Sequence, residues 1–322
     1  MDAPFPIDFV IPWVDGSDPV LGAVRSRYLT PAAASDDAVA GPTRYASDWE
    51  IVGCVASILR FAPFARNVFI VTDGQDPHLE GFISRYFPRT STTVRVVGHR
   101  EIFRGREEVL PVFNSRAIGT MIWNIDGLSE HFVYMDDDFA LLRPAAPEDF
   151  FRGDRVVCYG RWMSAPWVRL LKALRPSHSG FKVQMLNALD YYKGGGSRFI
   201  CLGHAPRPLL RSWFAVWAEE RPDMLRINLT GKFREPFHFQ AQEPFVLAMA
   251  DEGKLALEPD GKNCHYYKYR DVPGYTERKI RSFVLHPDRL SVCMNSLDKC
   301  PSEDKNALRE YLEGLFSCKL DL

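Results

Sequence analysis

Short apolar runs and amphipathic segments alternate along the first half of the chain. Residues 7–12 and 67–72 are apolar runs that lead into Asp-Gly pairs, which predicts buried strands that open into loops. Between them, residues 49–61 carry apolar side chains at helical spacing and are followed by Pro63, which predicts a helix that ends there.

The same alternation continues to about residue 151. Further helices are predicted near residues 77–86 and 115–123, and further strands at residues 93–97 and 132–135. Because strands that alternate with helices form parallel sheets covered on both faces, we expect an α/β fold with a mainly parallel, Rossmann-like sheet flanked by helices. Ligands collect at the carboxyl ends of such strands, and acidic residues follow there at Asp15, Asp73 and residues 136–138.

The second half of the chain has a weaker periodicity. Basic and aromatic stretches occupy residues 162–172 and 265–269, and residues 302–316 have a helical pattern. We expect a second lobe with long loops over residues 152–322, joined to residues 1–151 as one integrated unit. Residues 25–43 are rich in Ala, Asp and Pro without a clear period, which predicts a mobile or partly helical connection.

Composition and charge exclude several classes of protein. The 322 residues are 46% hydrophobic, which is enough for a substantial core and argues against a disordered or fibrous chain. The 40 Lys and Arg nearly balance the 41 Asp and Glu, so no overall field would attract nucleic acid or anionic lipid. Any attraction for phosphate must therefore be local.

Seven scattered cysteines favour reduced thiols in a cytoplasm over a disulfide framework, and the lack of a CxxC pair argues against structural zinc. The first residues carry an acid and prolines where a secretory signal needs a basic region and an apolar stretch. Since no apolar run approaches the roughly 20 residues that span a bilayer, we expect a cytoplasmic protein.

Three adjacent carboxylates, Asp136, Asp137 and Asp138, follow the apolar run FVYM. Their mutual repulsion at a strand end would be costly unless a cation neutralised it, which favours a site for Mg²⁺ or Mn²⁺ bridging a diphosphate. The alternative is a solvated acidic turn.

The loop formed by Asp15, Gly16, Ser17 and Asp18 is a second candidate for ligand binding. Its carboxylates could do no more than cap a turn. Trp13 lies beside the loop at the strand end and could stack on a base or sugar ring, which favours a binding role.

Attack by a sugar hydroxyl on phosphorus needs a base with a pKa near the working pH, and histidine meets that need. His204, in the turn sequence CLGHAPRP, is the first candidate, with His99, His238 and His265 as rivals. Arginine can bind two oxygens of a phosphoryl group at once, and Arg234 in GKFREPFHFQ is the first candidate of that type.

Asn114 and Ser115 begin a predicted helix, where N-cap side chains and phosphate ligands both occur. The sequence lacks the GxxxxGK[ST] loop of P-loop ATPases, a strand followed by GxGxxG, and a GxSxG elbow. The residues alone therefore predict a metal-assisted α/β enzyme that acts on a phosphorylated or nucleotide-linked ligand.

Several ordered segments resemble the conserved regions of Stealth proteins. The first is IDFVIPWVDGSDP, and the second runs from RYASDWEIVGCVASILRFAPFARNVFIVTDGQDPHL through VRVVGHREIF and LPVFNSRAI to GLSEHFVYMDDDF. The segments GHAPRPLL, GKFREPF and SVCMNSLDKC resemble the third and fourth regions. The resemblance spans nearly the whole chain and implies a GT-A-like sheet with a donor-binding half and an acceptor-side lobe.

The resemblance also implies roles for particular residues. Asp15 and Asp18 fall at the donor site, and the family's Asn-Asp-Asp motif falls on residues 136–138, with Asp137 and Asp138 catalytic or metal-linked. The third region's His and Arg fall on His204 and Arg234. In the fourth region the usual Leu-Asn-Asp is replaced by Met294, Asn295 and Ser296, so that either Asp298 supplies the last metal ligand or Asn295 acts without it.

The activity implied is transfer of a hexose-1-phosphate, such as N-acetylglucosamine-1-phosphate, from a nucleoside-diphosphate sugar to a glycan or lipid-linked oligosaccharide in capsule or exopolysaccharide biosynthesis. A peripheral association with the inner face of the membrane is implied as well. Two alternatives stay open: a metal-dependent glycosyltransferase that releases nucleoside diphosphate, and a non-catalytic protein that binds sugar nucleotides.

Overall fold

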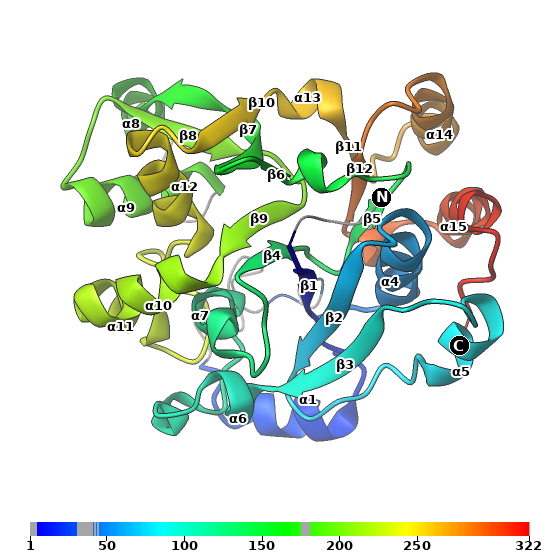
Figure 1. The fold of residues 1–322 in the computed structure, drawn as a ribbon, viewed down its shortest axis with the longest axis horizontal. Coiled ribbons are helices and arrows are strands. Elements are labelled where there is room, and N and C mark those ends of the chain that lie inside the picture. Colours follow the sequence, from blue (N-terminus) through cyan, green and yellow to red (C-terminus); the bar gives the residue numbers. More distant parts are fainter. Residues whose placement is uncertain (1–4, 31–40, 42, 44, 175–180, 322) are drawn as a thin grey trace.

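The computed structural model describes residues 5–30, 41, 43, 45–174 and 181–321. Its central sheet has the strand order β3-β2-β1-β4-β9 (Figure 1). The strands are β1 (Ile7–Pro12), β2 (Ala65–Thr72), β3 (Thr93–Gly98), β4 (His131–Tyr134) and β9 (Arg207–Leu210). The pairs among β1 to β4 are parallel, and β9 runs antiparallel to β4, so the predicted α/β fold with a mainly parallel sheet is confirmed.

Helices flank this sheet largely where the periodicity predicts them. The helices of the first half are α1 (Pro19–Ser26), α4 (Glu50–Phe61), α5 (Glu80–Tyr86), α6 (His99–Ile102) and α7 (Ser115–Met121). Helix α1 overlaps the start of the predicted connection over residues 25–43, of which residues 31–40 and 42 lie outside the described part of the chain. Helix α4 is buried along almost its whole length because it packs between the central sheet and later helices.

The second half adds strands to two smaller sheets. One contains β10 (Leu255–Glu258), β7 (Arg155–Ser164), β6 (Phe151–Arg152) and β8 (Arg198–Leu202), and the other contains β11 (Cys264–Lys268), β12 (Ser291–Asn295) and β5 (Phe139–Leu141). Strand β9 joins the central sheet, and β12 pairs with β5 from the first half. The two halves of the sequence therefore share sheets.

The later helices cover opposite sides of the molecule. They are α8 (Ala165–Leu174), α9 (Phe181–Lys193), α10 (Arg211–Glu220), α11 (Pro222–Leu229), α12 (Gln242–Asp251), α13 (Asp260–Asn263), α14 (Tyr275–Leu285) and α15 (Ser302–Phe316). In Figure 1, α9 to α12 lie on one side, whereas α15 lies on the other beside α4 and α14 packs on α15. Within the described residues, no helix combines the length and apolar character needed to cross a bilayer.

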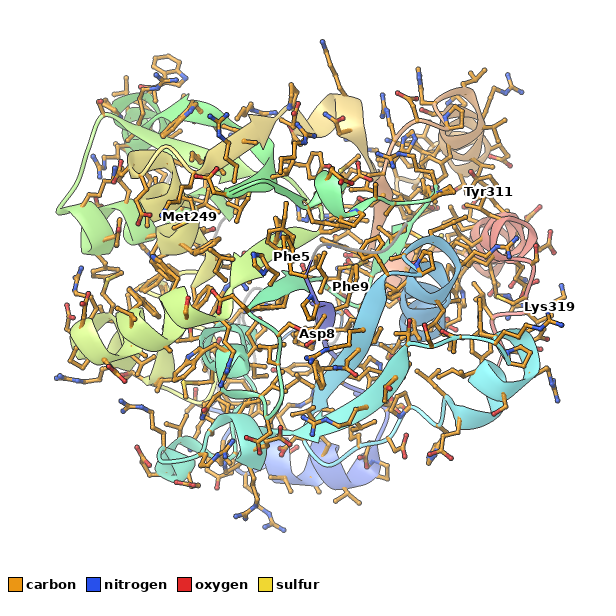
Figure 2. The ribbon with its side chains drawn as sticks, in the orientation of Figure 1. Phe5, Asp8, Phe9, Met249, Tyr311 and Lys319 are labelled. Atoms are coloured by element: carbon orange, nitrogen blue, oxygen red, sulfur yellow. The ribbon has the colours of Figure 1, made fainter. Side chains whose placement is uncertain are left out.

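A buried carboxylate holds the start of the central sheet together. Asp8 lies on β1 next to Phe9 (Figure 2) and is completely buried. Its carboxylate accepts hydrogen bonds from Arg66 Nη2 at 2.6 Å and Ser129 N at 2.7 Å, and two more from Asn67. A charge without water is stable only when its lone pairs are satisfied, and these contacts satisfy it while linking β1 to β2 and to the segment before β4.

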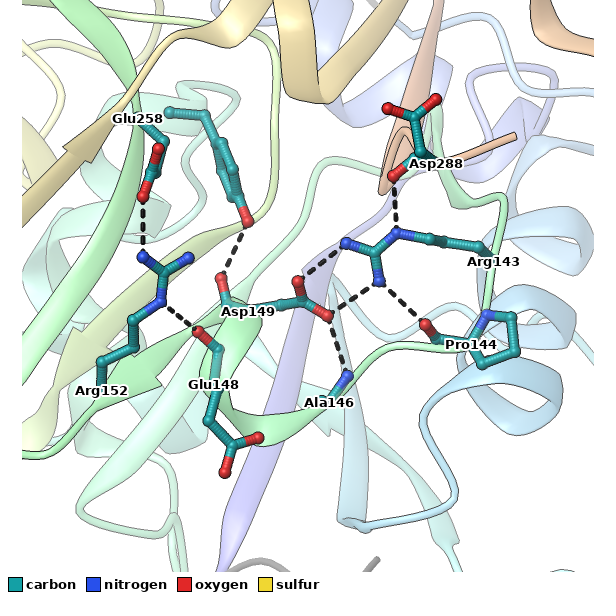
Figure 3. Close-up of polar contacts among 9 residues, drawn as sticks. Arg143, Pro144, Ala146, Glu148, Asp149, Arg152, Glu258 and Asp288 are labelled. Carbon is teal, nitrogen blue, oxygen red and sulfur yellow. Dashed lines mark hydrogen bonds and ion pairs between the residues drawn. The ribbon is translucent and has the colours of Figure 1, made fainter. Parts of the chain in front are cut away.

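A second polar cluster lies around Asp149 in the turn between β5 and β6 (Figure 3). Arg143 donates to both carboxylate oxygens of Asp149, at 2.8 and 3.0 Å, and to the backbone oxygen of Asp288 at 2.7 Å. This bidentate arrangement fixes the turn against the segment before β12. The seven cysteines, all inside the described ranges, are buried free thiols.

Candidate active site

A cleft of about 720 Å³ opens at the carboxyl ends of β1 and β4. Many of the residues singled out from the sequence line it: Trp13, Asp73, His99, Ser115, Asp136, Asp137, Asp138, His204, Arg234, Asn295, Ser296 and Asp298. Four others, Asp15, Gly16, Asp18 and Asn114, lie nearby but do not line it. The cleft thus brings together side chains from segments that are more than 200 residues apart in the sequence.

The acidic run after β4 is half-buried at this cleft. Asp136 accepts a hydrogen bond from Tyr134 Oη at 2.9 Å, and Asp138 accepts a weak one from Cys293 Sγ at 3.5 Å. Burial, together with the charge of Asp136, raises the pKa of Asp138 to about 7. Burial and then the charge of Asp138 raise the pKa of Asp137 well above its usual value. Burial and the neighbouring carboxylates thus disfavour the ionised forms of Asp137 and Asp138, and a bound cation would offset this effect.

The donor set suits a hard divalent cation that shares its coordination with substrate. Within the described part of the chain, no three His, Cys, Asp or Glu side chains form a ready-made metal cage. Mg²⁺ often takes only one or two protein carboxylates and completes its shell with phosphate oxygens and water. Asp137 and Asp138 could hold such an ion, and Asp298 lines the same cleft.

His204 is presented by the turn between β8 and β9. The turn is held by a hydrogen bond from Gly203 N to Tyr159 O at 2.7 Å. The imidazole stacks on the Tyr266 ring, with centroids 4.7 Å apart and an interplanar angle of 24°. Burial lowers the pKa of His204, and the neighbouring charge of Arg207 lowers it further. Both effects favour the neutral imidazole, which is the form that can accept a proton.

The rival histidines have other surroundings. His238 is buried, with Nε2 2.9 Å from Thr230 O and Nδ1 accepting from Glu235 N at 2.9 Å, so that both ring nitrogens are used within the protein. His265 is buried beside Arg289. His99 does line the cleft, where Nδ1 lies 3.7 Å from Asp73 Oδ1, and burial lowers its pKa to about 4.

The first turn of α7 contacts the candidate arginine. Arg234 donates from Nη2 to Ser115 Oγ at 2.5 Å. Asn114 caps the helix by accepting from Arg116 N at 3.0 Å, and its Nδ2 lies 3.2 Å from His238 Nδ1. Asn114 is completely buried and holds the start of α7 in place beside the cleft. Its contact with a nucleotide-sugar donor stays a prediction.

The loop after β1 uses its carboxylates internally. Asp15 Oδ1 accepts from the backbone and hydroxyl of Ser17, and Asp18 caps α1 by accepting from Val20 N at 2.8 Å. Gln75 donates to Asp18 Oδ2 at 3.0 Å and to the backbone oxygen of Asp15 at 2.8 Å. The Gln75 hydrogen bond is the main reason that the pKa of Asp18 is lowered.

Trp13 differs from the loop that follows it, because it lines the cleft while its Nε1 donates to Ser47 Oγ at 2.9 Å. A direct contact of Asp15, Gly16 and Asp18 with a donor stays a prediction.

The segment SVCMNSLDKC also reaches the cleft. Asn295, Ser296 and Asp298 all line it, and Asp298 Oδ2 accepts a hydrogen bond from Thr43 Oγ1 at 2.7 Å. Ser296 has a left-handed backbone with φ of 63°, which turns the chain from β12 into the short 3₁₀ helix Leu297–Lys299. The shifted position of Asp298 is thus compatible with a place in the site.

Sequence reasoning missed Arg116 and Arg207. Both line the cleft and are buried, with exposed fractions of 8% and 3%. Burial lowers the pKa of Arg116 to about 10, which still leaves it protonated near neutral pH. Arg207 lies three residues after His204 and Arg116 directly after Ser115, so proximity to those candidates was the available signal.

The chain matches models of two Stealth regions: Stealth protein CR1, conserved region 1, over residues 5–30, and Stealth protein CR2, conserved region 2, over residues 44–158. The capsular polysaccharide phosphotransferase LcbA of Neisseria meningitidis is 34% identical over 286 residues, which cover 85% of this chain and 72% of LcbA. The chain belongs to the Stealth protein family. The resemblance of its first two regions is thereby confirmed.

Another Stealth relative is the exopolysaccharide phosphotransferase SCO6023 of Streptomyces coelicolor, 42% identical over 297 residues, which cover 91% of this chain and 48% of that protein. The chain spans about half the length of three curated Streptomyces coelicolor relatives that it matches, SCO6021, SCO6023 and SCO2594. Among solved structures, the galactosyltransferase LgtC in complex with donor and acceptor sugar analogues covers 96% of this chain and 95% of its own, with 11% identity and a TM-score of 0.43.

Proposed function

We propose that this Stealth protein transfers a hexose-1-phosphate from a nucleoside-diphosphate sugar to a glycan hydroxyl in capsule or exopolysaccharide biosynthesis. The observation that carries the proposal is the meeting of His204, Arg234 and Asp138 in one cleft. A base, a phosphate-binding cation and a carboxylate for a metal are the groups that phosphoryl transfer requires. The phosphotransferase names of LcbA and SCO6023 support the same reaction class.

The cleft suits a nucleotide sugar in size and lining. Its volume of about 720 Å³ lies within the range of small-molecule sites. Trp13 supplies an aromatic ring on which a base or sugar can stack. The acceptor in this proposal is a glycan or a lipid-linked oligosaccharide.

The proposed step is an in-line displacement at the β-phosphorus. His204 accepts the proton of the attacking hydroxyl while the new oxygen–phosphorus bond forms. The bond from the β-phosphorus to the bridging oxygen breaks, and the nucleoside monophosphate leaves with that oxygen. The sugar keeps its anomeric phosphate, so the product contains a phosphodiester.

Arg234 would bind phosphoryl oxygens through its guanidinium and stabilise their charge in the transition state. Its hydrogen bond to Ser115 fixes the plane of that guanidinium before substrate arrives. A divalent ion, Mg²⁺ or Mn²⁺, held by Asp137 and Asp138 would neutralise charge on the diphosphate. Asp298 is the proposed third carboxylate.

The test is an incubation of purified protein with UDP-N-acetylglucosamine and related donors, Mg²⁺ and a panel of glycan acceptors, with the nucleotide products separated by chromatography. We expect acceptor-dependent nucleoside monophosphate that disappears on chelation and in Asp138→Asn. Release of nucleoside diphosphate would instead identify a glycosyltransferase. Donor binding without turnover, unchanged in His204→Ala, would identify a binding protein.

A further inference from the structure

Two arginines lie inside the candidate cleft, within the segments LPVFNSRAI and GHAPRPLL, and the proposed step gives a role to neither. Arg116 is in α7 and Arg207 begins β9. Each is more than nine-tenths buried, yet each lines the cleft. Burial lowers the pKa of Arg116, and the nearby charge of Arg207 contributes to the lowering.

Several donor atoms of these guanidiniums are unused. Nε and Nη1 of Arg207 and Nε of Arg116 have no hydrogen-bond partner in the part of the chain that the structure describes. A buried charged donor without a partner is unfavourable, so such donors usually face a ligand, an ion or water. Their position at the cleft points to a ligand.

The neighbouring carboxylates do not accept hydrogen bonds from the unpaired donor atoms of these arginines. Asp136 Oδ2 lies 4.0 Å from Arg207 Nη1, beyond hydrogen-bond distance, and its other oxygen accepts from Tyr134. Glu243 is buried nearby, but its Oε1 also lacks a partner among the described residues. The guanidinium carbon of Arg207 also lies 5.7 Å from the centroid of the Tyr134 ring.

We propose that Arg116 and Arg207 form an anion subsite that binds a phosphate group of a substrate inside the cleft, in addition to Arg234. The inference rests on the proposed function and names further binding residues for it. A tetrahedral phosphate has several oxygens and can therefore accept hydrogen bonds from one arginine on α7 and another on β9. Each guanidinium can bind two such oxygens at once. The phosphate can be that of the nucleotide donor or that of a phosphodiester already present in the acceptor.

The test measures binding without turnover. Isothermal titration calorimetry compares inorganic pyrophosphate, UDP, uridine and a phosphodiester-containing glycan fragment on the whole protein and on Arg116→Gln and Arg207→Gln. We expect each variant to bind pyrophosphate about tenfold more weakly, since a hydrogen bond to a charged group is lost, with uridine binding unchanged. A parallel loss for UDP assigns the subsite to the donor, and a loss for the glycan fragment assigns it to the acceptor.

Arg143→Gln is the matched control, because Arg143 is a partly buried arginine whose donors are used by Asp149 and backbone oxygens outside the cleft (Figure 3). We expect its pyrophosphate affinity to equal that of the unmodified protein. If a glutamine variant fails to fold, Arg116→Lys and Arg207→Lys keep the charge but lose the fork, and we expect weaker pyrophosphate binding in them too.

Unchanged pyrophosphate affinity in folded variants would overturn the subsite and leave the two arginines with a structural role. The outcome is separable from that of the proposed function, because binding is measured without an acceptor reaction. A glycosyltransferase product pattern with weakened pyrophosphate binding would refute the proposed function and retain the subsite. Phosphoryl transfer with unchanged pyrophosphate binding would support the proposed function and refute the subsite.

Discussion

Arg234 and Ser115 are joined by a hydrogen bond of 2.5 Å between Nη2 and Oγ, although 119 residues separate them. The contact connects the segment GKFREPF to the first turn of α7, at the cleft that also holds His204 and Asp138. Because Ser115 holds one guanidinium nitrogen, Arg234 is held in place at the cleft before a substrate binds.

Ser115→Ala should lower kcat/KM about tenfold, since it removes one hydrogen bond to a charged group that orients the transition-state contact. We expect most of the loss in kcat if Arg234 acts on the transferring phosphoryl group. Ser212→Ala, which removes a hydroxyl bonded to Glu130 outside the cleft, is the control and should leave both constants unchanged. In an Arg234→Lys background, Ser115→Ala should have little further effect, and a full additional loss would contradict the positioning role.

Gly16→Ala should destabilise the loop after β1. A Cβ at position 16 would lie 2.2 Å from the backbone oxygen of Tyr45, to which Gly16 N also donates at 2.7 Å. Overpacking of this kind costs about 1–3 kcal/mol of unfolding free energy, measurable by urea denaturation. Gly22→Ala in α1 has nothing within 4 Å of the new Cβ and should stabilise the protein by up to ~1 kcal/mol. Equal effects of the two substitutions would contradict the close packing of the loop.

Asp8→Ala should lower the unfolding free energy by about 3–5 kcal/mol, because it leaves Arg66 and buried backbone donors without their acceptor. Arg104→Ala removes an exposed ion pair of 2.8 Å with Asp126 and should change the unfolding free energy little, because solvent screens exposed pairs. Asp8 does not line the cleft, so donor affinity should survive in Asp8→Ala at temperatures where it is folded. A loss of stability no larger than that of Arg104→Ala would argue against a structural role for Asp8.

His238 should make the protein sensitive to acid. Burial lowers its pKa to about 4, whereas the unfolded chain retains a value near 6.5. Between these values the unfolded chain binds more protons, so the unfolding free energy should fall as the pH drops from 6.5 to 4, by up to ~3 kcal/mol for this residue. Urea titrations across this range should give a shallower dependence for His238→Gln than for the unmodified protein. The exposed His78→Gln is the control, and an equal slope in both variants would contradict the assignment.

The order of strands and helices in the first half could be predicted because its elements have clear periods. The placement of Asp137 and Asp138 followed from the same pattern, since they come directly after a short apolar run. The roles within the Asp15 loop could not be predicted, because the residue that holds it, Gln75, lies 60 positions away.

The burial of Arg116 and Arg207 could not be predicted either, because it also depends on contacts between distant segments. An arginine is usually exposed, whereas the tertiary packing around α7 and β9 buries these two. Resemblance to known motifs identified His204 and Arg234, whereas the contacts that orient them come from the tertiary fold.

The most direct test of phosphoryl transfer follows the β-phosphate of the donor. With UDP-N-acetylglucosamine labelled at the β-phosphorus and an acceptor that supports turnover, the account predicts that the label enters the glycan and that unlabelled UMP is released. The incorporation should require Asp138 and His204. Label recovered in UDP, with an unlabelled sugar on the glycan, would contradict the account and show that the acceptor attacks the anomeric carbon.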